Sequence, residues 1–343
     1  MMNYKETFLF IGKCLTLLKE ETNRAEVRED LLENRVDWDK IVQVSTEHYV
    51  FPTLYVNLRE LDLLNLLPVG LVEFMTDVYV QNHDRNRAIL QQAKDINAAL
   101  KEHGIAAVFM NGVGLLLDGL YQDVGERMIS DIDLLVDASD IESVVEILGE
   151  RGYLIKSFNK RELKRGTTRL IHDVNVAAVG IKTKVIRNSD KFTLDEFMPA
   201  IRMTKDDCRV MSYSQQMFMA IMTAYHNGHG YNCYAIPLRN IYDVHLLSSK
   251  VVYFDFFTKT PKFFVKINAF MVMANYITGS KSLLYVASKK SNQFLGKIQR
   301  LIEDPRRYRK KIWFNLFLVS IKKWIRNMIK YPYWEQLKLA FSS

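Results

Sequence analysis

The segment SDIDLLVD, residues 130–137, places two acidic residues inside an otherwise strongly apolar run. Its other members, such as Ile132 and Leu134, are of the kind that fills a buried β-strand. Burying a carboxylate without a partner is energetically costly, because the charge loses its hydration. A fold that buries this strand must therefore provide a cation or polar groups for Asp131 and Asp133.

A divalent metal would meet this requirement. Side chains two positions apart on a strand share a face, so Asp131 and Asp133 project together and repel each other unless a cation lies between them. Mg²⁺ prefers oxygen ligands and commonly binds through a few carboxylates plus substrate phosphates. Two such ions can align an attacking oxygen and neutralise a leaving pyrophosphate. We expect Asp173, in the strand-like segment RLIHDVNV, to complete the site from a neighbouring strand.

A glycine-bearing turn precedes the acidic pair. In FMNG, Gly112 follows a short apolar run and precedes the helix-like VGLLLDGLY. A glycine there lets the backbone approach a phosphate closely, while the N–H groups of the helix face the anion. The same glycine would also serve a plain strand-to-helix turn, and acidic pairs also occur at solvated strand ends. The combination of turn and acidic pair is more specific than either feature alone.

The hydrophobic pattern changes twice along the chain. Residues 1–103 space their apolar side chains three and four positions apart, which is typical of helices. Residues 104–190 contain short strand candidates separated by helix candidates, and residues 191–343 return to the helical pattern. We therefore predict an α+β fold, in which a small mixed β-sheet core with helices packed on it is flanked by N-terminal and C-terminal helical regions.

The formal net charge of +8 belongs to the end of the chain. Residues 305–343 hold ten Lys or Arg and one acid, Glu335, which gives +9 and leaves −1 (8 − 9) for all other residues. A general nucleic-acid-binding surface is therefore not favoured.

The apolar run 312–321 within this basic tail is too short to cross a bilayer and fits an amphipathic helix. It would make weak contact with an anionic membrane surface, hold a polyanionic acceptor, or pack onto the body of the protein. We expect packing, through the aromatic and aliphatic side chains of Trp313, Phe314, Phe317 and Leu318.

Cysteine usage and hydropathy predict a cytoplasmic protein. Cys14, Cys208 and Cys233 are far apart and form no CxxC pair, which argues against a disulfide framework and a structural zinc site. No segment reaches the roughly eighteen uninterrupted apolar residues of a membrane span. The N-terminal residues 1–21 are typical of an amphipathic helix rather than a signal peptide.

Residues 110–153, MNGVGLLLDGLYQDVGERMISDIDLLVDASDIESVVEILGERGY, resemble the core of the uncharacterised nucleotidyltransferase family, which belongs to the DNA polymerase β-like superfamily. The family pattern is a glycine-containing turn, a helix ending in Leu-Tyr, an arginine, Asp-Ile-Asp-Leu-Leu-Val, a further helix and Gly-Tyr. The matching positions here are Gly112, Leu120, Tyr121, Arg127, 131–136, Gly152 and Tyr153. A looser similarity extends to about residue 250.

The resemblance implies a metal site and a nucleotide site. Mg²⁺ or Mn²⁺ would be held by the three carboxylates of Asp131, Asp133 and Asp173, the last of which would also help to activate the acceptor. The nucleotide would contact Asn111, Gly112 and Arg127, although the family usually has Lys at the first of these positions. The implied reaction transfers a nucleoside monophosphate from an NTP to an acceptor, with loss of pyrophosphate. The sequence names neither the base nor the acceptor, which would be a small molecule, saccharide, peptide or protein.

Two other functions share some of these features. A nucleotide-sugar glycosyltransferase also holds a divalent ion with an Asp-x-Asp pair, but such enzymes place a nucleotide-binding sheet where this chain has only helical pattern. A catalytically inactive scaffold would keep the fold and would lack metal-dependent NTP binding.

Two further groups of polar residues have alternative readings. His226 and His229 would ligate a metal or cap a helix end. A basic loop would hold triphosphate or form a solvated hairpin, and its cationic residues are Lys160, Arg161, Lys164 and Arg165.

Overall fold

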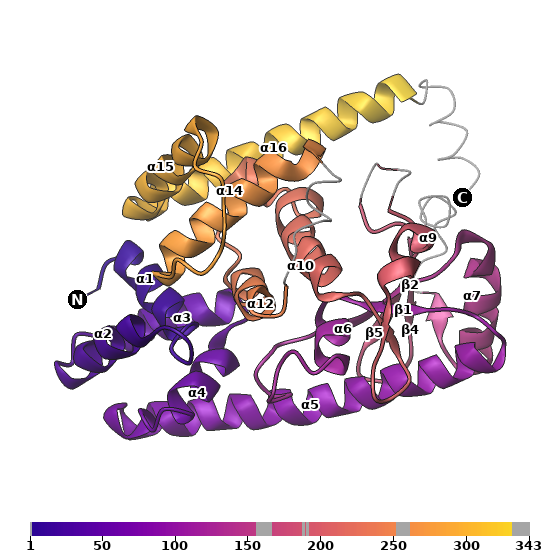
Figure 1. Cartoon of the computed structure of the whole chain (residues 1–343), viewed down its shortest axis with the longest axis horizontal. Coiled ribbons are helices and arrows are strands. Elements are labelled where there is room, and N and C mark those ends of the chain that lie inside the picture. Colours follow the sequence, from indigo (N-terminus) through magenta and orange to yellow (C-terminus); the bar gives the residue numbers. More distant parts are fainter. Residues whose placement is uncertain (1, 156–166, 187–188, 190–191, 252–260, 331–343) are drawn as a thin grey trace.

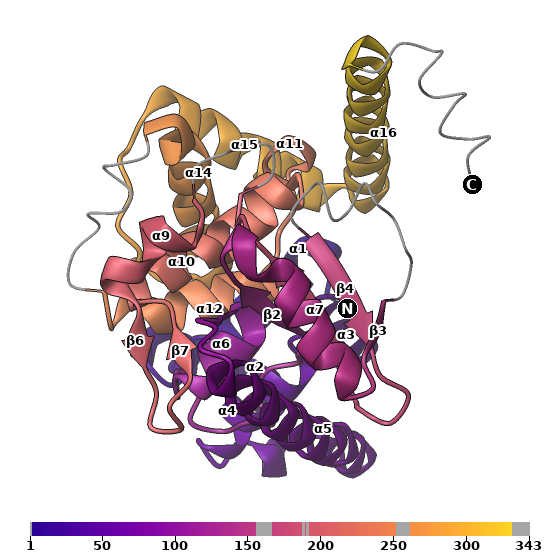
Figure 2. The same cartoon turned by 90° about the vertical axis from the view of Figure 1, so that its right-hand side faces the viewer.

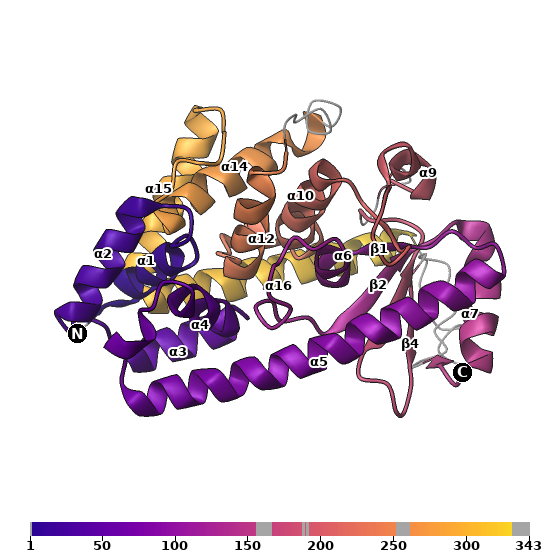
Figure 3. The ribbon, with the colours of Figure 1, turned by 60° about the horizontal axis from the view of Figure 1, so that its bottom comes forward.

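The computed structural model describes residues 2–155, 167–186, 189, 192–251 and 261–330. Figure 1 shows two groups of elements side by side: helices from both ends of the chain, and a β-sheet with its own helices. The long helix α5 (Val69–Glu102) runs along both groups and joins them, as Figure 3 shows from another side. The predicted α+β fold, with a mixed sheet and flanking helices, is confirmed.

The N-terminal region is helical, as predicted. Its elements are α1 (Tyr4–Cys14), α2 (Glu21–Leu32), α3 (Trp38–Glu47), α4 (Phe51–Arg59), a short 3₁₀ turn (Leu64–Leu66) and α5. A capping box between Asn3 and Glu6 satisfies backbone N–H groups where α1 begins. α1 packs closely against α14 (Pro261–Thr278), since a Cβ at Gly12 would lie 1.9 Å from the carbonyl oxygen of Ile277. The two ends of the chain therefore form one helical layer.

The sheet has seven strands in the order β3-β4-β5-β2-β1-β7-β6. β2 (Asp131–Leu135) lies at its centre, antiparallel to β1 (Val108–Met110) and parallel to β5 (Ala178–Lys182). The outer strands on one side are β3 (Leu154–Ile155) and β4 (Thr167–Ile171), and those on the other are β6 (Arg202–Met203) and β7 (Arg209–Val210). The apolar residues of β2 are fully buried, as a central strand requires.

The sheet extends beyond the residues expected to hold it. β6 and β7 lie in the C-terminal region, residues 191–343, which we predicted to be helical, and β7 pairs with β1. The expected boundary at residue 190 therefore cuts through the sheet. Each of these strands is only two residues long, so neither can show the alternation of polar and apolar residues by which a strand is recognised.

Helices cover the sheet and form the rest of the C-terminal region. α6 (Asn111–Leu117) follows β1, and a 3₁₀ turn (Ala138–Asp140) leads into α7 (Ile141–Glu150). After α9 (Leu194–Phe197) and another 3₁₀ turn (Met198–Ala200) come α10 (Tyr213–Met222), a π-helical turn (Thr223–Asn227), α11 (Gly230–Cys233), α12 (Leu238–Ser248), α14, α15 (Lys289–Glu303) and α16 (Pro305–Lys330). No helix in the described ranges is long and apolar enough to cross a membrane.

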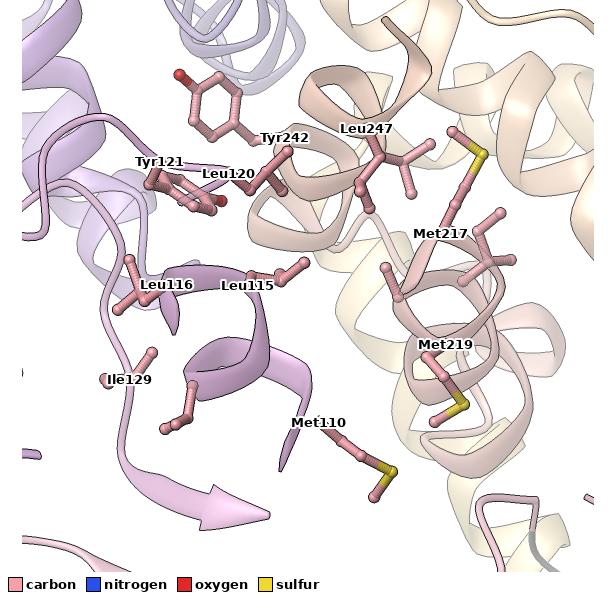
Figure 4. Packing of buried hydrophobic residues seen from close by; sticks show 14 of the residues in the cluster. Met110, Leu115, Leu116, Leu120, Tyr121, Ile129, Met217, Met219, Tyr242 and Leu247 are labelled. Atoms are coloured by element: carbon pink, nitrogen blue, oxygen red, sulfur yellow. The ribbon is translucent and has the colours of Figure 1, made fainter. Parts of the chain in front are cut away.

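The core joins the sheet to these helices. Figure 4 shows Leu115 of α6 on the side facing α10 and α12, where Met217, Met219 and Leu247 lie. All four side chains are buried, so the segment that carries the turn glycine is fixed between the sheet and the C-terminal helices.

The last helix, α16, does not pack as we predicted. Trp313 is 68% exposed and Phe317 is 48% exposed, and Phe314 and Leu318 are exposed as well. The face that contacts the body is a different stripe of the helix, of which Tyr308 is buried. The prediction that the four apolar side chains pack onto the body is therefore wrong.

Candidate active site

A pocket opens where the N-terminal end of β2 meets α6, α10 and α12. Its wall combines the turn between β1 and α6, the segment leading into β2, and the first turns of α12. Its polar and charged lining includes Asn111, Arg127, Asp131, Asp133, Arg239, Asn240 and Asp243. The structure thus brings Asp131 and Asp133 together with the turn glycine, Gly112, which also lines the pocket.

The two strand carboxylates have different surroundings. Asp131 is partly exposed and accepts a hydrogen bond from the hydroxyl of Ser130, at 3.1 Å. Asp133 is buried and has two protein partners: Lys182 Nζ lies 2.7 Å from Oδ1, and the Asn111 side-chain amide donates to Oδ2. Lys182 on β5 and Asn111 in the turn therefore provide the polar partners that a buried Asp133 requires.

The strand-to-helix turn expected at Gly112 lies between β1 and α6. Asn111 has a φ of +53°, a left-handed conformation that asparagine tolerates better than most residues, and this directs its amide to Asp133. A Cβ at Gly112 would lie 2.3 Å from Arg127 Nη1 and 2.5 Å from Ile129. The close approach that requires glycine here is thus to the Arg127 side chain.

Arg127 is buried and held in a bidentate ion pair. Its Nε and Nη2 each lie 2.8 Å from an oxygen of Asp243, on α12, and the Tyr121 hydroxyl also donates to that carboxylate. Burial alone would lower the pKa of Arg127, but the Asp243 carboxylate raises it above its ordinary value, so the guanidinium stays charged. Its carboxylate partner is Asp243.

Asp173 does not occupy the place expected for it. It lies in the connection between β4 and β5, where it is exposed, and it does not line the pocket. The ring nitrogen Nδ1 of His172 accepts hydrogen bonds from the N–H groups of Val174 and Asn175, so the chain turns at this point. The prediction that Asp173 lies on a strand next to β2 is wrong. The alternation of polar and apolar residues that indicated a strand continues beyond the end of β4, into the turn.

The neighbour of β2 on the side away from β1 is β5, which contributes no acid. Gly180 pairs with Asp133, and a Cβ at Gly180 would lie 2.8 Å from Asp133 Oδ1. Lys182 lies two residues after Gly180, on the same face of β5, and its ammonium is the one that pairs with Asp133. Within the described residues, no group of three or more His, Cys, Asp or Glu is placed to hold a metal ion.

Four residues at the site, three in the pocket wall and Lys182 beside Asp133, were not singled out from the sequence. Three of them, Arg239, Asn240 and Asp243, are polar residues within the otherwise apolar helix LRNIYDVHLL, and that irregularity was the available signal. Arg239 is anchored by a hydrogen bond to the Met128 carbonyl, at 3.2 Å, and by the ring of Tyr49. No comparable pattern in the sequence indicates Lys182, because it meets Asp133 only through the pairing of β5 with β2.

The remaining candidates lie elsewhere or are not described. His226 belongs to the π-helical turn, and its Nδ1 lies 2.7 Å from Lys266 Nζ. His229 adopts a left-handed backbone directly before α11, with no side-chain cap hydrogen bond. The basic loop that holds Lys160, Arg161, Lys164 and Arg165 lies outside the described residues.

The arrangement matches the core that the sequence resemblance implied: a glycine-bearing strand-to-helix turn next to a central strand with two carboxylates on one face. The model of a family described as "Uncharacterised nucleotidyltransferase" matches residues 34–257, which is more than half of the chain. The protein therefore belongs to this nucleotidyltransferase family and, at the level of enzyme class, is a transferase. No match was found among curated proteins.

Proposed function

We propose that the protein is a metal-dependent nucleotidyltransferase, which moves a nucleoside monophosphate from an NTP to an acceptor and releases pyrophosphate. The observation that carries this proposal is the opening of both Asp131 and Asp133 into one pocket, beside the turn that contains Gly112, in a member of a nucleotidyltransferase family.

The residues present suit a hard divalent cation. Two carboxylates on one face of a strand offer oxygen ligands, and Mg²⁺ commonly binds through one or two carboxylates, with water and substrate phosphates in the remaining positions. Asp131 is the more accessible of the two, and Asp133 is already oriented by Asn111 and Lys182. A bound Mg²⁺ or Mn²⁺ would neutralise the charge that develops on the leaving pyrophosphate.

The protein's own residues would position the nucleotide around this pair. Asn111 fixes the Asp133 carboxylate, and the Arg127–Asp243 ion pair fixes the wall behind Gly112. Arg239 and Asn240 contribute donors from α12 to the same pocket, which suits the negative charge of a triphosphate. Asp173 has no role in this proposal, because it lies outside the pocket.

One observation favours a second candidate, the inactive scaffold. Asp133 already has a cationic partner in Lys182, so the pocket is electrostatically balanced without a metal. Such a scaffold would keep the fold and would show no metal-dependent NTP binding, whereas the proposed enzyme would show it.

We expect Mg²⁺ or Mn²⁺ to raise NTP affinity by at least about tenfold, and Asp131→Asn with Asp133→Asn to remove that increase, because the carboxylates supply the metal ligands. Calorimetric titration of the four NTPs, with metal and with a chelator, measures both quantities. Asp173→Asn is the matched control and should behave as wild type. Equal NTP binding by the wild type and the double variant would refute the proposal.

We expect Lys182→Met to strengthen binding of Mn²⁺ to the nucleotide-free protein by about tenfold, because it removes a positive charge 2.7 Å from a ligand oxygen. Titration of Mn²⁺ followed by electron paramagnetic resonance measures this affinity. The control is Lys101→Met, which removes an exposed lysine that is paired with Asp207 outside the pocket. Unchanged Mn²⁺ affinity in Lys182→Met would show that the ammonium does not compete with the metal.

A further inference from the structure

Helix α16 contacts the body of the protein along one narrow stripe. Tyr308 is buried, and Ile312, Asn315 and Val319, which follow at helical spacing, are partly buried. The Asn315 side chain donates to the carbonyl of Asn232, near α11, at 2.7 Å. α16 is therefore anchored at its beginning, and Figure 2 shows its remaining length projecting from the molecule.

The rest of the helix surface carries large apolar side chains in contact with solvent. The exposed residues are Trp313, Phe314, Leu316, Phe317 and Leu318. The rings of Trp313 and Phe317 stack with centroids 5.6 Å apart, so they form one apolar surface. Contiguous exposed apolar surface of this kind marks a binding face more often than scattered single residues do.

Positive charge borders this apolar surface. The first two turns of α16 carry five exposed cationic residues, Arg306, Arg307, Arg309, Lys310 and Lys311. Residues 305–321 include no acidic residue, so nothing on this stretch of helix offsets the charge. The face therefore combines apolar anchors with an uncompensated positive field, and a partner must offer negative charge next to an apolar phase.

We propose that the outward face of α16 binds the surface of an anionic lipid bilayer. The aromatic and aliphatic side chains enter the boundary between headgroups and acyl chains, and the arginines and lysines contact lipid phosphates. Trp and Phe favour this interfacial depth, and the cationic residues lie directly before them on the same outward side of the helix. The inference does not depend on the proposed function, since α16 lies outside the pocket.

The chemistry of the face distinguishes this occupant from two others. A nucleic acid would use the basic residues and would stack on Trp313, but it would leave Leu316 and Leu318 exposed to water. A second copy of this chain would bring together two helices that both carry uncompensated positive charge. Of these three occupants, the anionic bilayer alone supplies both an apolar phase and negative charge.

The test is co-sedimentation of the full-length protein with vesicles of phosphatidylcholine alone and with added phosphatidylglycerol. We expect binding to the anionic vesicles that weakens as salt rises from about 0.1 M to about 0.5 M. The variant Trp313→Ser with Phe317→Ser should bind at least about tenfold more weakly. Both side chains are exposed, so the fold should be unchanged.

The matched control replaces exposed apolar residues on the opposite side of the molecule. Val69→Ser with Phe74→Ser, on α5, should bind vesicles as wild type does; Figure 1 shows α5 and α16 along opposite edges. Absence of binding to anionic vesicles would overturn the proposal, as would equal binding by both double variants. Binding to poly(U) that competes with vesicles and is the tighter of the two would assign the face to nucleic acid instead. A concentration-dependent dimer abolished by that variant would assign it to a second copy.

Discussion

Replacing Asp243 by alanine is expected to lower the free energy of unfolding by about 4 kcal/mol. Asp243 is almost completely buried, and it is the bidentate partner of Arg127, whose side chain is nearly as inaccessible. The substitution leaves a buried guanidinium without its counter-charge and removes the acceptor of the Tyr121 hydroxyl. Both losses act in the same direction, because an unpaired buried charge and an unpaired buried donor each retain their desolvation penalty. Chemical denaturation followed by circular dichroism measures the change.

A double-mutant cycle separates the ion pair from the packing around it. Arg127→Met with Asp243→Leu removes both charges while keeping most of the side-chain volume, so it should destabilise the protein much less than Asp243→Ala does. If the effects of the single substitutions simply add in the double variant, the two residues are not energetically coupled and the prediction fails. Because Arg127 also packs against Gly112, loss of Asp243 should disturb the pocket as well as the fold.

The local part of this fold was predictable from the sequence. β1, the turn at Gly112 and the strand that carries Asp131 follow one another within about 30 residues, and their apolar periods and turn residues are short-range signals. The same stretch carried the family resemblance, which the family match confirms over a longer range, residues 34–257.

The non-local part was not predictable in the same way. The partner of Asp133 is Lys182 because β5 lies parallel to β2, and a parallel pairing across some 45 residues leaves no periodic signal. Asp173 was misplaced because a polar and apolar alternation continues through the turn after β4. The exposed face of α16 depends on which stripe meets the body, and helical periodicity alone does not select that stripe.

A second large effect is expected from pH, through Glu126. This side chain is buried, and it accepts a hydrogen bond from the Tyr242 hydroxyl on α12. Burial raises the pKa of Glu126 from 4.5 to about 7, against the opposing effect of the Tyr242 hydrogen bond, and the nearby carboxylates of Asp123 and Glu60 act in the same direction as burial. The folded protein therefore holds a proton at this site that the unfolded chain releases near its ordinary pKa.

The sign of the effect follows from this difference. Since the folded-state pKa is the higher one, the contribution of Glu126 to stability is complete below about pH 4.5 and is lost as the pH rises through about 7. At about 1.4 kcal/mol per pKa unit, the loss is about 3 kcal/mol. Glu126→Gln keeps an acceptor for the Tyr242 hydroxyl and cannot ionise. The free energy of unfolding of this variant should therefore not show this decrease. The free energy of unfolding of the wild type minus that of the variant should fall by about 3 kcal/mol between pH 4.5 and pH 8.

The comparison with Glu126→Gln isolates this group from two histidines, one buried and one partly buried, that act in the opposite direction. Burial lowers the pKa of His48 and of His245 from 6.5 to about 4, so their contribution is present above pH 6.5 and is lost as the pH falls towards 4. Both histidines remain in the variant, and their effect cancels in the difference. Glu142→Gln, at an exposed carboxylate on α7, should keep the wild-type profile. If wild type and Glu126→Gln show parallel pH profiles in denaturant titrations, folding does not shift the pKa of Glu126 and the prediction is wrong.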